Sequence, residues 1–248
     1  MATSRSTRRP PPRPPRASAV LASDEAYDRL RDRIVSGRLA PGSRLVEAEV
    51  ALALGLSRTP VRSAIQRLRQ EGYVISDTAR VRAIPFVAPL RREDGDELFE
   101  LLGKMESLAA RRATRLPDDA RHALADRLAA INRALLTCDP DARDGEVSRL
   151  HVLHGDFHRE LVRSAAGPRL RASHDALNAQ AERYERVYSS LVAETPASVE
   201  EHDAIIDAIR RADVAGAERA TENNWIRSAE RLRRVIERAQ ELGAGWAS

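Results

Sequence analysis

Apolar residues recur every three or four positions through most of the chain, and this period constrains the fold more than any other feature. It is clearest after Arg91, where the first apolar face holds Leu98, Leu101, Leu102, Met105 and Leu108. Aromatic residues make up only 4 % of the chain, which also disfavours a β-sandwich or barrel. The pattern predicts five to seven amphipathic helices over residues 91–242, packed as an all-α antiparallel bundle. The helices are separated by four breaks, at Pro117, Pro140, Gly167-Pro168 and Pro196.

Residues 24–86 have a different organisation, with shorter elements and frequent turn signals. Three helices are predicted, over residues 26–37, 45–54 and 58–71. Two β-prone runs follow, at residues 73–75 and 81–84, and the polar turn between them predicts a hairpin. Pro85 and Pro89 then mark the boundary with the bundle. The expected fold class is therefore mainly α: an N-terminal winged helix-turn-helix followed by an all-α bundle.

Residues 1–23 are predicted to be a disordered basic tail, because prolines and arginines dominate them and no apolar core can form. The first sixteen residues hold five arginines and no acidic residue. Such an arm could follow DNA phosphates, or it could be an unstructured leader. The apolar stretch that a signal peptide needs is missing. No run of about 18 apolar residues occurs either, so no membrane span is expected.

A helix-turn-helix needs a small residue where its two helices approach each other and a tight turn between them. Ala51 and Gly55 fit these roles, since glycine readily adopts a positive φ. Ser57 is a good N-cap for the third helix, and Pro60 is tolerated because it falls in the first turn. The spacing of these residues predicts that the helix over residues 58–71 is a recognition helix.

One face of that helix carries side chains suited to DNA. Arg58, Arg62 and Gln66 are four residues apart, and Thr59 lies beside Arg58. Guanidinium groups at this spacing can contact guanine edges or phosphates from the major groove. Residues 26–87 hold eleven arginines against six acidic residues, which also favours a polyanionic partner. The alternative is an ordinary surface helix whose arginines are solvated.

The stretch from Leu30 to Ile84 resembles the DNA-binding domain of the GntR family of bacterial regulators. The matching motifs are Gly37-x-Leu39-x-Pro41-Gly42-x-x-Leu45-x-Glu47, Leu56-Ser57-Arg58-Thr59-Pro60-Val61-Arg62, Leu68 and Glu71-Gly72. The resemblance implies that Arg58, Thr59 and Arg62 contact a double-stranded DNA operator and that two subunits pair as a homodimer. Ser57 and Gln66 are included in the expected contact set. The hairpin would be a wing whose Arg80 reaches phosphates, although its tip lacks the usual glycine.

Histidines in the bundle are spaced for a metal. His154 and His158 are four residues apart and share a helical face, and His202 begins another helix. Imidazoles from two helices can converge on one ion. The alternative is that these are surface or hydrogen-bonded histidines. A related hypothesis is a metal-dependent hydrolase that uses a three-histidine centre, with Asp156, Glu201 or Asp203 as the base.

Residues 93–230 resemble the FCD sensor domain of the FadR subgroup. The matches are Glu97-Leu98 to Met105-Glu106, Phe157-His158-x-x-Leu161, and Glu201-His202-x-x-Ile205-x-x-Ala208 with Ala217. The resemblance implies a divalent metal (zinc, nickel or manganese) at the positions of His154, His158, His202 and Asn224. Two of these depart from the family pattern, because His154 replaces an aspartate and Asn224 replaces a histidine.

The same resemblance implies a small-molecule effector in the bundle. The position that often holds an effector-binding arginine is Leu102, so Arg183 and Arg186 are the candidate effector-binding residues in its place; the alternative is that both are solvated. The function predicted overall is a ligand-controlled DNA-binding regulator, most often a repressor in this family, and not an enzyme. The hydrolase and a ligand-free helical adaptor are the alternatives. The single cysteine, Cys138, favours a reducing, cytoplasmic setting.

Overall fold

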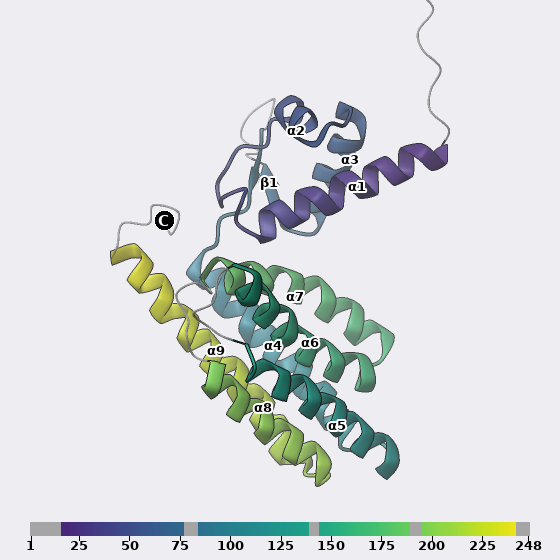
Figure 1. Ribbon diagram of the computed structural model, residues 1–248, viewed down its shortest axis with the longest axis vertical. Helices are drawn as coiled ribbons and strands as arrows, with labels where there is room; N and C mark the ends of the chain where they lie inside the picture. Colours follow the sequence, from purple (N-terminus) through teal and green to yellow (C-terminus); the bar gives the residue numbers. More distant parts are fainter. Residues whose placement is uncertain (1–15, 77–83, 139–143, 189–194, 242–248) are drawn as a thin grey trace, which may run out of the picture.

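Two groups of helices lie one above the other in Figure 1. The structure is a computed structural model that describes residues 16–76, 84–138, 144–188 and 195–241. The N-terminal group contains α1 (Arg16–Val35), α2 (Glu47–Leu54), α3 (Arg58–Gln70), β1 (Val74–Ser76) and β2 (Pro85–Val87). The second group is a bundle of α4 (Arg92–Ala113), α5 (Asp118–Leu135), α6 (Asp144–Ala165), α7 (Pro168–Tyr188), α8 (Thr195–Arg210) and α9 (Val214–Glu241). The predicted mainly-α class is confirmed.

Helix α1 begins earlier than the sequence predicted. It starts at Arg16, so residues 16–23, which were expected to be disordered, are helical. The reason lies in local composition: after Pro15 this stretch holds Ala17, Ala19 and Ala22, and alanine has the highest helix propensity. Residues 1–15 of the predicted tail lie outside the described residues.

Helix α3 follows the predicted pattern closely. Its buried side chains are Val61, Ala64, Ile65 and Leu68, which pack with α1 and α2 in one apolar core. Gly55 ends α2 in the left-handed conformation, with φ 67° and ψ 27°, as the predicted turn requires. Leu56 N–H donates to the carbonyl of Ala51 at 3.0 Å and closes this turn. The helix-turn-helix is therefore present as predicted.

Two antiparallel strands form the base of the predicted hairpin. Strand β2 covers Pro85–Val87 and pairs with β1 so that Val74 faces Val87. Of the predicted second run, Ile84 precedes this strand, and residues 81–83 lie outside the described residues. Proline is tolerated at the first position of a strand, where its missing N–H does not break the ladder. The Pro85 carbonyl accepts a hydrogen bond from Leu45 N–H at 2.8 Å. The tip of the hairpin, residues 77–83, lies outside the described residues.

The bundle has two buried apolar clusters. One surrounds Phe157 and Leu161 between α4, α5, α6 and α8, and the other surrounds Phe99 and Trp225 between α4, α7 and α9. Residues 88–91 connect β2 to α4. Among the residues that the structure describes, no helix combines the length and apolarity needed to cross a membrane. The buried polar residues of the bundle lie between these clusters and form the site considered next.

Candidate functional site

The polar face of α3 is open to solvent. Ser57, Arg58, Thr59, Arg62 and Gln66 are all exposed, opposite the buried stripe of the same helix. Ser57 occupies the N-cap position with φ −76° and ψ 163°, but its hydroxyl makes no capping hydrogen bond. These five predicted DNA contacts therefore share one accessible surface. Arg80 lies in the part of the hairpin outside the described residues.

Three histidines of the bundle meet at one point. Each of His154, His158 and His202 offers a ring nitrogen, and these atoms lie within 4.8 Å of one another. The ring centroids of His154 and His158 are 4.8 Å apart, and His202 stacks on Phe157 at 3.8 Å. Helices α6 and α8 therefore bring together the imidazoles that the sequence predicted to share a metal.

The hydrogen bonds of this cluster leave particular atoms free. His158 Nδ1 donates to the carboxylate of Glu106 at 2.6 Å, and His202 Nδ1 donates to the amide oxygen of Asn132 at 2.9 Å. The Nε2 atoms of both rings are buried and have no hydrogen-bond partner among the described residues. Asn224 donates to Glu201 at 2.9 Å, which leaves its buried Oδ1 unpartnered as well. Unpaired buried acceptors are costly, so these three atoms are candidates for a partner that the protein itself does not supply.

Burial favours the neutral form of two of the three imidazoles, those of His154 and His202. Burial, followed by the nearby His158, lowers the pKa of His154 well below its ordinary value. The same two causes lower the pKa of His202. A neutral imidazole is the form that binds a metal, so the lowered pKa values of His154 and His202 are compatible with coordination.

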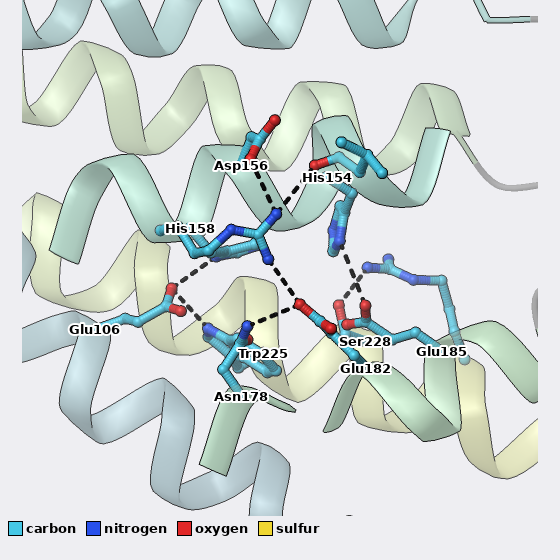
Figure 2. A network of polar contacts seen from close by, with 12 residues as sticks. Glu106, His154, Asp156, His158, Asn178, Glu182, Glu185, Trp225 and Ser228 are labelled. Atoms are coloured by element: carbon cyan, nitrogen blue, oxygen red, sulfur yellow. Dashed lines mark hydrogen bonds and ion pairs between the residues drawn. The ribbon is translucent and has the colours of Figure 1, made fainter. Parts of the chain in front are cut away.

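Glu106 is the centre of a network that the sequence pattern did not reveal. It is fully buried on α4 and accepts three hydrogen bonds, from His158, from His174 Nε2 at 2.8 Å and from Trp225 Nε1 at 2.9 Å. Figure 2 shows its carboxylate between His158 and Trp225. Burial opposes its ionisation, but His158 and His174 outweigh this and hold the pKa of Glu106 below its ordinary value. Its partners are 52 to 119 residues distant in sequence, so no local spacing could have identified it.

Glu185 is a second acidic neighbour that sequence reasoning missed. Its carboxylate lies 3.9 Å from His154 Nδ1, on the α7 side of the cluster (Figure 2). Burial raises the pKa of Glu185 to about 7. The carboxylates considered for catalysis have other partners. Asp156 is half exposed and bonds to Arg159, Glu201 bonds to Arg231, and Asp203 accepts from Asn132.

Arg183 does not face the histidine cluster. It is buried on α7 and donates to the carbonyl of Ala88, in the segment between β2 and α4, at 2.6 Å. Its guanidinium also lies 5.7 Å from the ring centroid of Tyr73. Helix α7 therefore directs Arg183 towards the DNA-binding half, whereas Glu185 of the same helix lies beside His154; the effector role of Arg183 stays a prediction. Arg186 lies on α7, but its side chain is outside the described residues. Leu102 is fully buried in the apolar core.

Helix α7 makes two further contacts, one with the N-terminal half and one with the connecting segment. The Gln180 amide donates to the carbonyl of Glu71, the residue that caps α3, and Tyr184 donates to the carbonyl of Arg91 at 2.9 Å. Gly72 allows this approach, since a Cβ there would collide with the Gln180 amide. One helix therefore contacts the histidine cluster on one side and the base of the recognition helix on the other.

Comparison with known proteins gives the family. Residues 97–227, more than half of the chain, match the FCD domain, and residues 22–80 match the "Bacterial regulatory proteins, gntR family". The chain belongs to the GntR family. Its FCD sensor domain follows the DNA-binding domain, as the resemblance implied. The expectation that this is a transcriptional regulator and not an enzyme is confirmed.

Relatives of this GntR-family protein carry matching names. It is 27 % identical over 222 residues to an HTH-type transcriptional regulator in an unstable DNA locus of Streptomyces ambofaciens, covering 89 % of each chain. It is also 27 % identical over 205 residues to the "Probable D-xylose utilization operon transcriptional repressor" of Paenarthrobacter nicotinovorans, covering 83 % of this chain and 86 % of the relative.

Solved structures share the fold. The structure of E. coli McbR/YncC superposes with a TM-score of 0.64 at 19 % identity, over 86 % of this chain and 97 % of that one. A GntR transcriptional regulator from Rhodococcus sp. RHA1 gives the same TM-score at 22 % identity, over 85 % of this chain and 96 % of the other.

Proposed function

We propose that this GntR-family protein binds a double-stranded DNA operator through α3. Its affinity for the operator changes when a small molecule binds in its FCD domain. The observation that carries the proposal is the exposed face of Arg58, Thr59, Arg62 and Gln66 beside the wing. A helix with this surface can lie in the major groove and contact base edges. The hairpin of β1 and β2 would be the wing and would contact DNA phosphates beside the groove that α3 occupies.

The regulator is proposed to act as a homodimer. Two copies of α3 would occupy successive major grooves of a near-palindromic operator, about 34 Å apart. Repression is the proposed outcome, because an operator-bound dimer excludes other proteins from the same DNA. The name of the Paenarthrobacter relative, a transcriptional repressor, supports this direction.

A divalent cation is proposed at the histidine cluster. His154, His158 and His202 would supply imidazole nitrogens, which suit zinc or nickel, and Asn224 would supply an amide oxygen, which suits a harder cation such as manganese. Glu106 and Asn132 would act as the outer hydrogen-bond partners that orient two of the imidazoles. When bound, the cation would add a positive charge that attracts an anionic effector. Glu185 supplies a carboxylate near His154, where the family pattern has an aspartate.

Helix α7 is the proposed link between effector and DNA. Glu185 and Glu182 lie on its cluster side, while Gln180, Arg183 and Tyr184 bond to backbone carbonyls of the DNA-binding half and the connecting segment. A ligand that shifts α7 would therefore change the position of α3. Couplings of this kind typically amount to about 1–3 kcal/mol, or five- to 150-fold in DNA affinity.

The DNA-binding proposal is tested by selecting genomic fragments that the protein binds and then measuring operator affinity for variants. Arg62→Ala is expected to weaken operator binding at least about tenfold, because it removes a guanidinium from the recognition surface. Arg211→Ala is the matched control, since Arg211 is also an exposed arginine but lies at the end of α8 in the bundle. Equal losses in the two variants would contradict the assignment of α3.

The metal proposal is tested by elemental analysis after loading with zinc and removing unbound ion. About one zinc per chain is expected for the native protein, and almost none when His154, His158 and His202 are all replaced by alanine. His122→Ala is the control, because His122 is exposed on α5 and should leave the zinc content unchanged. Zinc that persists in the triple variant would place the ion elsewhere.

A further inference from the structure

Arg62 on the recognition surface is held by an acidic residue from the preceding helix. Glu47 begins α2, and Arg62 lies in α3. The Nε atom of Arg62 donates to the two carboxylate oxygens of Glu47 at 2.9 and 3.1 Å, and its Nη2 atom donates to Oε2 at 2.7 Å. The two side chains therefore form a two-pronged ion pair across the helix-turn-helix.

This ion pair contributes little to stability. The Arg62 side chain is 61 % exposed and that of Glu47 is 32 % exposed. Ion pairs in such surroundings are screened by water and salt, and most have a small effect on folding. A carboxylate beside the recognition face also repels DNA phosphates. The position of Glu47 is therefore better explained by what it does to Arg62.

Guanidinium geometry shows what that effect is. The group presents two edges, one formed by Nε with Nη2 and the other by Nη1 with Nη2. Glu47 occupies the first edge, and no hydrogen bond to Arg62 Nη1 occurs among the described residues. The remaining edge is the pair of donors that matches O6 and N7 of guanine. Fixing the side chain before DNA arrives also reduces the rotamer entropy lost on binding.

We propose that Glu47 is a positioning residue for base recognition, which holds Arg62 so that its Nη1–Nη2 edge faces a guanine in the major groove. The inference rests on the proposed function, since it requires that α3 lies in the groove. Glu47 makes no contact with DNA in this proposal, but through Arg62 it contributes to the sequence preference of the regulator.

Glu49 provides a matched control for this role. It lies two residues after Glu47 in the same first turn of α2, and it is exposed. Among the residues that the structure describes, Glu49 forms no ion pair, whereas Glu47 is paired with Arg62. Replacing either glutamate by alanine removes the same charge from the same helix, but only one replacement frees Arg62.

The experiment measures binding of the full chain to its selected operator and to operators in which each base pair is exchanged in turn. Native protein, Arg62→Ala, Glu47→Ala, Glu47→Gln and Glu49→Ala are compared by fluorescence anisotropy at one salt concentration. The base pair at which Arg62→Ala loses its preference while Glu49→Ala keeps it is the base pair that Arg62 contacts. Native protein is expected to discriminate there by about tenfold or more.

Glu47→Ala is expected to reduce that discrimination to about threefold or less while unrelated DNA is bound as well as, or better than, by native protein. Glu47→Gln should keep part of the discrimination, because its amide oxygen can still accept from Arg62. Glu49→Ala should keep all of it. Melting temperatures equal to that of native protein show that the variants are folded. If Glu47→Ala is unfolded, Glu47→Gln serves as the test.

Two results would overturn the inference, and they differ from failure of the proposed function. If Glu47→Ala keeps native discrimination at that base pair, or changes binding exactly as Glu49→Ala does, Glu47 acts only through its charge. If Arg62→Ala changes preference at no position, Arg62 does not contact a base, and the proposed recognition surface is wrong as well.

Discussion

Glu201→Ala is expected to lower the free energy of unfolding by about 3–5 kcal/mol, because it leaves a buried arginine without its counter-charge. Glu201 and Arg231 are 7 % and 8 % exposed, and their carboxylate and guanidinium form two hydrogen bonds of 2.8 and 3.0 Å between α8 and α9. The variant also leaves the Asn224 amide, now bonded to Glu201, without a partner. Urea denaturation followed by circular dichroism measures the change.

Two comparisons isolate the cause. Asp126→Ala breaks an exposed pair with Arg210 and should cost about 1 kcal/mol or less, since Asp126 is 74 % exposed. The double variant Glu201→Leu with Arg231→Leu removes both buried charges and should recover most of the lost stability. A loss below about 1 kcal/mol for Glu201→Ala would mean that water reaches Arg231 and that the pair is not buried in solution.

Glu106→Ala is the second large effect expected. It would leave three buried donors, on His158, His174 and Trp225, without an acceptor. An unsatisfied buried polar group costs about 1–3 kcal/mol, so the variant should lose roughly 3 kcal/mol or more of unfolding free energy. Because His158 loses the partner that orients its ring, zinc affinity should also fall, by about ten- to 100-fold.

Denaturation and a competitive zinc titration measure the two effects of Glu106→Ala separately. Glu100→Ala on the same helix is the control, since Glu100 is exposed and its replacement should change neither quantity. Unchanged zinc affinity in a folded Glu106→Ala protein would show that the ring of His158 is oriented by its packing alone.

The parts of this molecule that sequence analysis predicted are those governed by short-range spacing. The turn at Gly55, the buried stripe of α3 and the shared face of His154 and His158 all follow from helical periodicity. His202 was grouped with them as a histidine at the start of another helix, and the family resemblance then placed all three at one site. The strand over Pro85–Val87 was not predicted, because Pro85 was taken as a boundary although a first strand position tolerates proline.

The missed residues depend on contacts between distant segments. Glu106 and Glu185 reach the histidine cluster from α4 and α7, at separations of 52 and 31 residues from the histidines that they approach. The hydrogen bond of Arg183 to the Ala88 carbonyl was not predicted either, because successive positions of a helix point about 100° apart and the sequence does not show which of them faces the linker. A neighbouring residue on α7 faces the cluster while Arg183 faces the linker.

The hydrogen bond from Gln180 to the carbonyl of Glu71 has a consequence for engineering. DNA-binding and sensor domains are often exchanged between regulators as if each were complete. In this chain the end of the recognition helix is completed by a side chain that comes 109 residues later. A chimaera that joins residues 16–87 to a foreign sensor would therefore lack that contact. Introducing Gln180, Arg183 and Tyr184 at the corresponding positions of the foreign domain would restore the hydrogen bonds that support the recognition helix and the linker.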